Sequence, residues 1–388
     1  MITILSMEGM SYEPIRVNLR RFRSALGMTQ EQVAEAAGIS RVAYRNLETG
    51  TSAPRMETLH ALARALEVRV QDLVTPAAEL RHVRFRSFRR LNTREQILIT
   101  VERWLRGFNE LEEILDDRLE YTLTGLGGEE RSPAEAARDV RSRFGLRSTE
   151  LVRDICGLLE ANGIKVLPLR IASDAFFGLS VSGEDGGPAV VVNTWDRISV
   201  ERWIFTAAHE LGHLVLHLDD YSLDQKDEEE RQEKEANLFA AHFLMPQGVF
   251  EKEWEETYGL AFVDRVLKVK RMFRVSYRTV LYRLSEAGRL GTEVWKRFQG
   301  EYQRRHGRTL LKDDEPEALA ADAFRATFPE ASRAGEPEDL SPSDFVEDRL
   351  LRLVRRAVES ETITLSRGAE ILGISLQDMR QLSASWIG

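Results

Sequence analysis

The chain has 388 residues, of which 43% are hydrophobic and 30% are charged, and its formal net charge at pH 7 is −9. The length suggests two or three domains, and the composition suits ordinary globular cores. A chain with this net negative charge is not a general polyanion binder, so any contact with DNA must be local.

Cysteine usage and hydropathy indicate the compartment. Cys156 is the only cysteine, which excludes an intrachain disulfide and favours a reducing cytoplasm. The sequence holds no run of about 18 apolar residues that could cross a membrane. Residues 1–10 lack the charged start and the cleavage region of a secretory signal. We therefore expect a cytoplasmic protein with no membrane partner.

The first 75 residues predict a helix-turn-helix. Residues 14–26 form a basic amphipathic pattern, residues 29–38 read as a short helix that stops at a glycine, and residues 40–48 read as a second helix with a serine cap. Two short helices joined in this way make a helix-turn-helix. The fuller string over residues 19–40, with residues 47–54, resembles the XRE or lambda-repressor-like DNA-binding domain over about residues 12–75.

This resemblance implies contacts with an operator DNA. The second helix would enter the major groove, and Gln30 would anchor the preceding helix on the phosphates. The outward residues implied for the second helix are Ser40, Arg41, Tyr44 and Arg45. Residues 1–75 carry nine arginines and eight acidic residues, so affinity per monomer would be modest. We expect a homodimer that reads paired half-sites; a module kept for protein contacts is the alternative.

Residues 76–147 are expected to form a helical connector. Residues 81–90 hold five arginines interleaved with aromatic residues, which could follow a phosphate backbone or dock on an acidic part of the chain. Residues 93–123 have apolar residues at three-and-four spacing, which predicts a long helix used for core packing, as a connector or for oligomerisation. Another helix is predicted to start at residues 132–133.

Residues 148–193 predict a helix followed by a small sheet. Residues 148–159 are amphipathic, and three short apolar runs bounded by turn residues follow at 164–169, 177–181 and 189–193. A sheet edge could hold a substrate peptide in extended form by strand addition. The sequence does not say which strand is the edge.

Residues 209–213 read His-Glu-Leu-Gly-His and predict a metal site. At about 100° per residue, positions four apart on a helix lie about 40° from each other, so His209 and His213 face one point. Such a pair suits zinc, and Glu210 can take a proton from a water and pass it to a leaving amine. Gly212 is costly inside a helix, which predicts the close approach of another backbone.

A third ligand is expected in the acidic stretch that follows. Helical phase places Glu233 and Asn237 on one face of a helix that ends before Pro246, so we assign Glu233 to the metal and Asn237 as a partner of a ligand histidine. Glu235 points about 200° away from Glu233 and ranks second. The other acidic residues of this stretch are Asp219, Asp220, Asp224, Asp227, Glu228, Glu229 and Glu230.

The same region resembles the ImmA/IrrE metallopeptidases over about residues 150–290. The matching positions are Asn193, Arg202, Phe205, Thr206, Ala208 to His213, His217, Glu233, Asn237, Ala240, Leu244, Met245 and Pro246. The resemblance implies a zinc endopeptidase with His209, His213 and Glu233 as ligands and Glu210 as general base. Members of this family cut transcriptional repressors. We read His217 as a partner of a ligand or as a core residue, because a fourth protein ligand would close the position that the water needs.

The remaining residues predict helices and a spacer. Residues 262–269 and 276–284 are helical patterns that close the peptidase domain at about residue 290. Residues 313–340 are rich in Glu, Asp, Pro and Ala, which indicates a flexible or partly helical spacer. Residues 366–380 resemble a degenerate helix-turn-helix within a helical C-terminal extension over 291–388, for which docking, substrate mimicry and DNA binding stay open.

Together these patterns predict a mainly α protein with a small sheet, of the α+β class. A lambda-repressor-like domain over 12–75 precedes a zincin-like peptidase domain over 148–290. The expected cofactor is one zinc ion per chain, or manganese in its place. The expected function is cleavage of a partner repressor or antitoxin, in a stress or mobile-element response, by a DNA-binding regulator. The alternative is a repressor whose metal site is structural or sensory, with little or no proteolysis.

Overall fold

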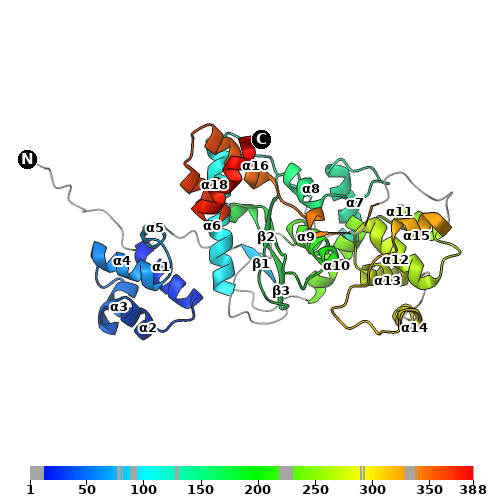
Figure 1. Cartoon of the computed structure of the whole chain (residues 1–388), viewed down its shortest axis with the longest axis horizontal. Helices are drawn as coiled ribbons and strands as arrows, with labels where there is room; N and C mark the ends of the chain where they lie inside the picture. The colour runs from blue at the N-terminus through cyan, green and yellow to red at the C-terminus, as the bar shows by residue number, and fades with distance from the viewer. Residues whose placement is uncertain are drawn as a thin grey trace, which may run out of the picture. The chain divides into compact units, whose positions relative to one another are not determined.

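The structure is a computed structural model that describes residues 13–76, 80, 82–87, 94–126, 131–217, 230–288, 291, 293–327, 337–338 and 340–387. The chain is mainly helical with one small sheet, as the sequence predicts (Figure 1). It divides into two compact units, one formed by Met1–Leu80 with Arg89–Trp104 and the other by Arg81–Phe88 with Leu105–Gly388. The expected connector is therefore shared between the two units.

The first unit is a bundle of short helices. They are α1 (Glu13–Ala25), α2 (Gln30–Ala36), α3 (Arg41–Glu48), α4 (Met56–Ala65) and α5 (Val70–Val74), and α6 (Arg94–Ile114) runs from this unit into the second. Thr29 caps α2, and the Ser40 hydroxyl caps α3 by accepting from the N–H of Ala43 at 3.1 Å. These caps satisfy N–H groups that a helix start leaves unpaired, so the chain turns between α2 and α3.

The second unit contains a four-stranded sheet in the order β1-β3-β4-β2. The strands are β1 (Val83–Ser87), β2 (Lys165–Leu169), β3 (Phe176–Val181) and β4 (Ala189–Asn193). β2 is parallel to β4, and β3 is antiparallel to both β4 and β1. The three strands predicted from apolar runs are present. β1 was not predicted, because it lies in the arginine-rich segment that we interpreted as a phosphate-binding or docking linker.

The helix predicted over 148–159 is shorter than expected. It is α8 (Ile155–Ala161), and the Asp154 carboxylate caps it by accepting from the N–H of Gly157 at 2.9 Å. The residues before it fold around the buried Arg141, whose guanidinium donates to the backbone carbonyls of Arg147 and Glu150. Those carbonyls are satisfied outside a helix, so the helix starts later.

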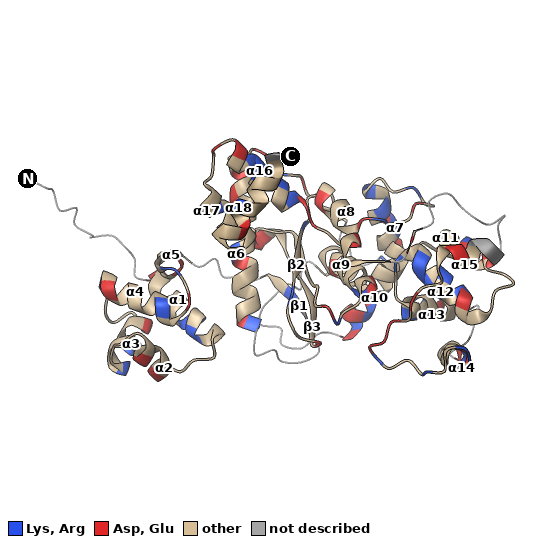
Figure 2. Ribbon diagram, viewed as in Figure 1, with Lys and Arg blue, Asp and Glu red and all other residues tan. Residues whose placement is uncertain are grey.

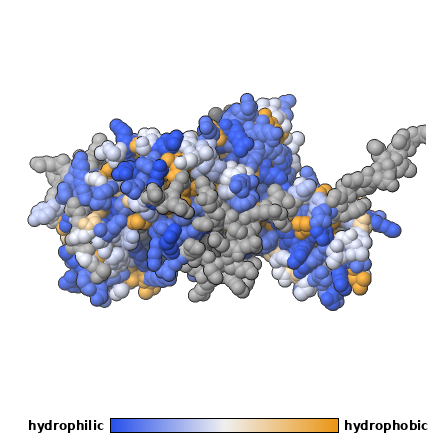
Figure 3. All heavy atoms as spheres, turned by 180° about the vertical axis from the view of Figure 1, so that it is seen from behind, coloured by the Kyte–Doolittle hydropathy of each residue, from blue (hydrophilic) through white to orange (hydrophobic). Residues whose placement is uncertain are grey.

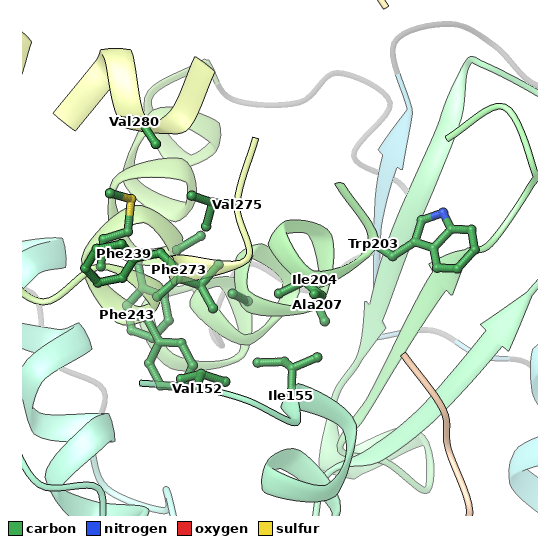
Figure 4. Close-up of a cluster of buried hydrophobic side chains, with 14 of the residues drawn as sticks. Val152, Ile155, Trp203, Ile204, Ala207, Phe239, Phe243, Phe273, Val275 and Val280 are labelled. Atoms are coloured by element: carbon green, nitrogen blue, oxygen red, sulfur yellow. The ribbon is translucent and has the colours of Figure 1, made fainter. Parts of the chain in front are cut away.

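The helices around the sheet bury a continuous apolar core. They are α7 (Pro133–Arg143), α8, α9 (Val200–Leu216) and α10 (Glu230–Leu244). Figure 4 draws Ile204 and Ala207 of α9 and Phe239 and Phe243 of α10 as members of this core. On the face drawn in Figure 3, hydrophobic residues form small patches among hydrophilic ones. The buried side chains that α9 and α10 share hold these two helices together.

Further helices complete the second unit. They are α11 (Gln247–Glu256), α12 (Phe262–Phe273), α13 (Tyr277–Glu286), α14 (Val294–His306), α15 (Ala321–Thr327), α16 (Arg349–Glu359), α17 (Leu365–Leu372) and α18 (Leu376–Ala384). Buried Glu112 of α6 contacts Lys165 of β2 at 3.0 Å and Arg349 of α16 at 2.6 Å. Arg367 of α17 pairs with Glu110 of α6. The segment that resembles a degenerate helix-turn-helix thus docks on α6.

Candidate metal centre and nucleic-acid interface

Helix α9 carries the His-Glu-Leu-Gly-His sequence inside the second unit. Residues 206–215 are all buried, because β3 and β4 pack on one side of α9 and α10 packs on the other. A Cβ atom added at Gly212 would lie 3.0 Å from the Phe239 ring and 3.3 Å from the Cα atom of Ala236. The expected close approach of another backbone at Gly212 is confirmed, and it brings α10 over the two histidines.

Two histidines and one carboxylate converge between α9 and α10. Nε2 of His209 lies 3.3 Å from Oε2 of Glu233, Nε2 of His213 lies 3.0 Å from Oε1 of Glu233, and the two nitrogens are 3.0 Å apart. Donor atoms bound tetrahedrally at about 2 Å from one ion lie about 3.3 Å apart, so this donor set fits zinc. Among the described residues this is the group of three or more acidic, His or Cys side chains that could hold a metal. Asp219, Asp220, Asp224, Asp227, Glu228 and Glu229 lie outside the described residues.

The Nδ1 atoms of His209 and His213, which point away from Glu233, each have a hydrogen-bond partner. Nδ1 of His209 lies 3.1 Å from the Asn237 side-chain oxygen, which accepts its hydrogen bond. Nδ1 of His213 lies 3.0 Å from Nδ1 of His217, whose Nε2 lies 3.0 Å from a carboxylate oxygen of Glu235. Such partners fix the orientation of each ring and direct its Nε2 toward the position that a metal would take. Asn237 and His217 therefore lie behind the two candidate ligand histidines, and Glu235 contacts His217.

Glu210 points from α9 toward β3 and is 0% exposed. Its Oε2 accepts a hydrogen bond from the Ser180 hydroxyl at 2.9 Å. β3 approaches α9 closely at Gly178, where an added Cβ atom would lie 2.6 Å from the Thr206 side chain and 3.3 Å from Oε1 of Glu210. Neither Ser180 nor Gly178 was predicted from the sequence. The sequence pattern that could have indicated them is a pair of small residues at alternate positions in an otherwise apolar strand.

The charges at this centre favour neutral histidine beside an ionised carboxylate. Burial lowers the pKa of His213 well below its ordinary value, although Glu233 opposes this effect. Burial alone would raise the pKa of Glu233, but the contacts with His209 and His213 outweigh it and lower that pKa below its ordinary range. Neutral imidazole and charged carboxylate are the forms that bind a metal ion.

Asn193, at the end of β4, fixes the loop that leads into β3. Its side-chain nitrogen donates to the carbonyls of Ile171, Ser173 and Phe176 at 2.9 to 3.1 Å. Its side-chain oxygen accepts from the N–H groups of Ile171 and Trp195 at 2.9 and 3.2 Å. A buried amide with this many bonds makes the loop rigid. Asn193 thereby sets the position of β3 above Glu210.

In the first unit, α3 presents part of the predicted DNA-contact set. Arg41 and Arg45 are exposed, and Ser40 is exposed at the helix start. Gln30 is half-buried at the start of α2. Val42 is 68% exposed, so an apolar side chain that the sequence analysis did not consider lies next to Arg41. An exposed apolar group on a helix of this kind can contact a thymine methyl group.

Tyr44 was wrongly predicted to point outward. Its side chain is 0% exposed, and its hydroxyl donates to the carbonyl of Leu19 at 3.3 Å. Tyr44 shares the inner face of α3 with Leu47 and Glu48, which lie three and four residues further along the helix. Glu48 pairs with Arg23 at 2.7 Å. Burial raises the pKa of the Tyr44 hydroxyl above its ordinary value, so this group is a neutral core donor.

The chain is similar to known families in two places. Residues 159–285 match the family described as IrrE N-terminal-like domain, and residues 19–73 match the family described as helix-turn-helix. The cryptic phage CTXphi transcriptional repressor RstR of Vibrio cholerae is 32% identical over 91 residues, which are 22% of this chain and 81% of RstR. The HTH-type transcriptional regulator y4dJ of Sinorhizobium fredii is 42% identical over 62 residues, which are 16% of this chain and 80% of y4dJ.

An HTH-type transcriptional regulator of Archaeoglobus fulgidus is also similar, at 36% identity over 59 residues, which are 15% of this chain and 84% of that protein.

The charges on the two units and the length of the helices complete the description. Basic and acidic residues intermingle along the ribbons of both units (Figure 2). Within the described ranges, every helix is too short or too polar to span a membrane.

Proposed function

Because the chain belongs to the helix-turn-helix transcriptional regulators and carries an IrrE N-terminal-like domain of the metallopeptidase type, we propose that it is a DNA-bound regulator that cleaves a partner protein. Residues 12–75 bind an operator as part of a homodimer, and residues 148–290 hydrolyse one or a few peptide bonds in a repressor or antitoxin. The observation that carries this proposal is the convergence of the donor atoms of His209, His213 and Glu233, with Glu210 directly after His209 in the same buried helix.

The residues fit a zinc-dependent hydrolysis. His209, His213 and Glu233 would hold the ion, and Asn237 and His217 would orient the two imidazoles. When bound, such an ion polarises the scissile carbonyl and acidifies a water molecule. Glu210 accepts the proton of that water at a carboxylate oxygen and returns it to the nitrogen of the leaving amine.

Ser180 supports the role of Glu210 as a base. Its hydroxyl donates to Oε2 at 2.9 Å, which holds the carboxylate in one orientation. The second oxygen, Oε1, is then the one that can take up the proton. A donor on one carboxylate oxygen also stabilises the charged form before proton transfer.

A repressor whose metal site is structural or sensory is the second candidate. The full burial of Glu210 and of His209 supports it, because a substrate must reach both groups. The two functions share the same metal and the same DNA surface. They differ in whether Glu210 is needed for the fate of a partner protein.

A Glu210→Gln variant separates the two functions. It should retain one zinc per chain, measured by elemental analysis, and bind operator DNA as the wild type does. Cleavage of a co-expressed repressor should fall by about 1000-fold or more, because the general base is lost. Glu317→Gln, which alters an exposed carboxylate, is the matched control. Equal cleavage by both variants would remove Glu210 from the mechanism, and zinc-loaded wild type without any cleavage would support the second candidate.

A further inference from the structure

Strand β1 covers the outer edge of β3. Its residues pair antiparallel with β3, with Val83 opposite Val181, Arg84 opposite Ser180 and Phe85 opposite Leu179. β1 is the last strand on this side of the sheet, and β2 is the last strand on the other side. The β3 edge is therefore filled by a segment of the same chain.

β3 is the strand that lies over the candidate base. Ser180 binds Glu210, and Gly178 allows the backbone of β3 to approach Oε1 of Glu210. An extended peptide paired with β3 would thus run past Glu210. The free edge of β2 is separated from β3 by β4, so it offers a peptide no such position. Strand addition at the β3 edge is the arrangement that brings a peptide bond to this carboxylate.

Arg84 of β1 occupies the space beside the metal ligands. It lies opposite Ser180, so both side chains are on the face of the sheet that meets α9. Arg84 is 8% exposed, and its Nη2 lies 3.9 Å from Oε1 of Glu233. Its Nε and Nη1 atoms are buried without a hydrogen-bond partner among the residues that the structure describes. Burying unpaired donors is unfavourable, so the burial of the Arg84 side chain opposes the pairing of β1 with β3.

β1 does not come from the family-matched segment. The match to the IrrE N-terminal-like domain begins at residue 159, and β1 ends at Ser87. The residues on both sides of Arg81–Phe88 belong to the first unit, whereas Arg81–Phe88 itself belongs to the second. The strand thus lies outside the matched range and comes shortly after the helix-turn-helix segment in the chain.

We propose that Val83–Ser87 occupies the substrate-binding edge of β3, and that an extended segment of the protein substrate must displace it and pair antiparallel with β3 in its place. This inference depends on the proposed peptidase function. While β1 is paired, a peptide cannot reach Glu210. The apparent affinity for substrate is reduced in proportion to the fraction of molecules in which β1 has left.

A reversible disulfide tests this proposal. The Ser182 N–H donates to the His82 carbonyl at 3.0 Å, which makes Val83 and Val181 a non-hydrogen-bonded pair with close side chains. In a Val83→Cys/Val181→Cys protein, oxidation should slow repressor cleavage by about tenfold or more, and reduction should restore it. Each single cysteine variant is a control, and native Cys156 is buried. Equal cleavage by the oxidised and reduced forms would overturn the proposal.

A second measurement does not depend on cleavage. In a Glu210→Gln protein, excess repressor should increase the hydrogen exchange of the Val83–Ser87 amides, because the substrate replaces β1. Unchanged exchange while the repressor is bound would overturn the proposal. A different result is that wild type cleaves no repressor while the repressor still increases the exchange of the β1 amides. That result would contradict the proposed peptidase function and would support β3 as the edge that binds the partner.

Arg84 variants distinguish a role of Arg84 in the occupying strand from a role in contacting the substrate, because the two roles predict opposite changes in the cleavage rate. Arg84→Pro removes a ladder hydrogen bond opposite Ser180, and it should raise the cleavage rate by about two- to tenfold because β1 leaves more often. Arg84→Ala should keep or raise the rate. Loss of cleavage in both variants, with zinc retained, would make Arg84 a substrate-contacting residue and would refute its role in an occupying strand.

Discussion

The metal centre and the helix-turn-helix differ in where their functional side chains find partners. In the second unit, His209, Glu210 and His213 are buried, and each has a partner within the chain. In the first unit, Arg41 and Arg45 are exposed on α3. Internal packing thus fixes the geometry of the candidate metal centre, whereas the arginine side chains of α3 extend into solvent. Substitutions of the candidate metal ligands should therefore change zinc binding, and substitutions of the exposed arginines of α3 should change the affinity for DNA.

The largest expected effect is at the third ligand. Glu233→Ala should lower zinc affinity by more than about 100-fold, because loss of a ligand exceeds the effect of losing a residue behind one. Zinc bound per chain after dialysis against a weak chelator measures this change. Glu235→Ala is the matched control, because the Glu235 carboxylate contacts Nε2 of His217 and not a candidate ligand. It should change affinity by at most about tenfold. Equal losses in both variants would show that Glu233 has no special place in the site.

Tyr44 tests the boundary between core and surface in the first unit. Tyr44→Ala should lower the free energy of unfolding of this unit by about 3–4 kcal/mol, because it leaves a cavity under α3. Tyr44→Phe loses one hydrogen bond and should lower the same free energy by about 1 kcal/mol. Hydrogen exchange of the α1–α5 amides in the whole chain measures both. A Tyr44→Ala protein with wild-type protection but weakened DNA binding would restore the outward assignment.

The smallest expected effect is at an exposed arginine. Arg41→Ala should weaken binding to the promoter upstream of the protein's own gene by about tenfold, which corresponds to one lost contact with DNA. A gel shift at fixed salt concentration measures it. Arg64→Ala, which removes an exposed arginine of α4, is the control and should bind nearly as tightly as wild type. Equal affinities of wild type and Arg41→Ala for the promoter would contradict the assignment of α3 to the DNA interface.

The sequence predicted the parts of the site that depend on helical period. Four-residue spacing placed His209 and His213 together, and the phase of a single helix placed Glu233 with Asn237. These relations are local, so they hold wherever the helix packs. The same reasoning predicted three strands from apolar runs and missed β1. β1 is arginine-rich, and its pairing depends on β3, which lies about a hundred residues away in the chain.

Errors arose where a distant contact decides a local structure. Tyr44 lies on the inner face of α3 with Leu47, and the packing of α1 against α3 buries it. The start of α8 depends on Arg141, which binds backbone carbonyls that a longer helix would use. Gly178 and Ser180 matter because β3 crosses α9 at that point. Period and propensity within one segment carry no information about such contacts.

The covalent attachment of β1 makes its competition with a substrate independent of dilution. A tethered segment acts at an effective concentration of about a millimolar, which a free protein in a cell rarely reaches. A substrate at micromolar concentration would therefore compete poorly with β1 unless it is held close to the enzyme. Binding to neighbouring sites on one DNA molecule would hold it there. A protein with a tethered occupant would then cleave a repressor bound beside it and leave the same repressor intact in free solution.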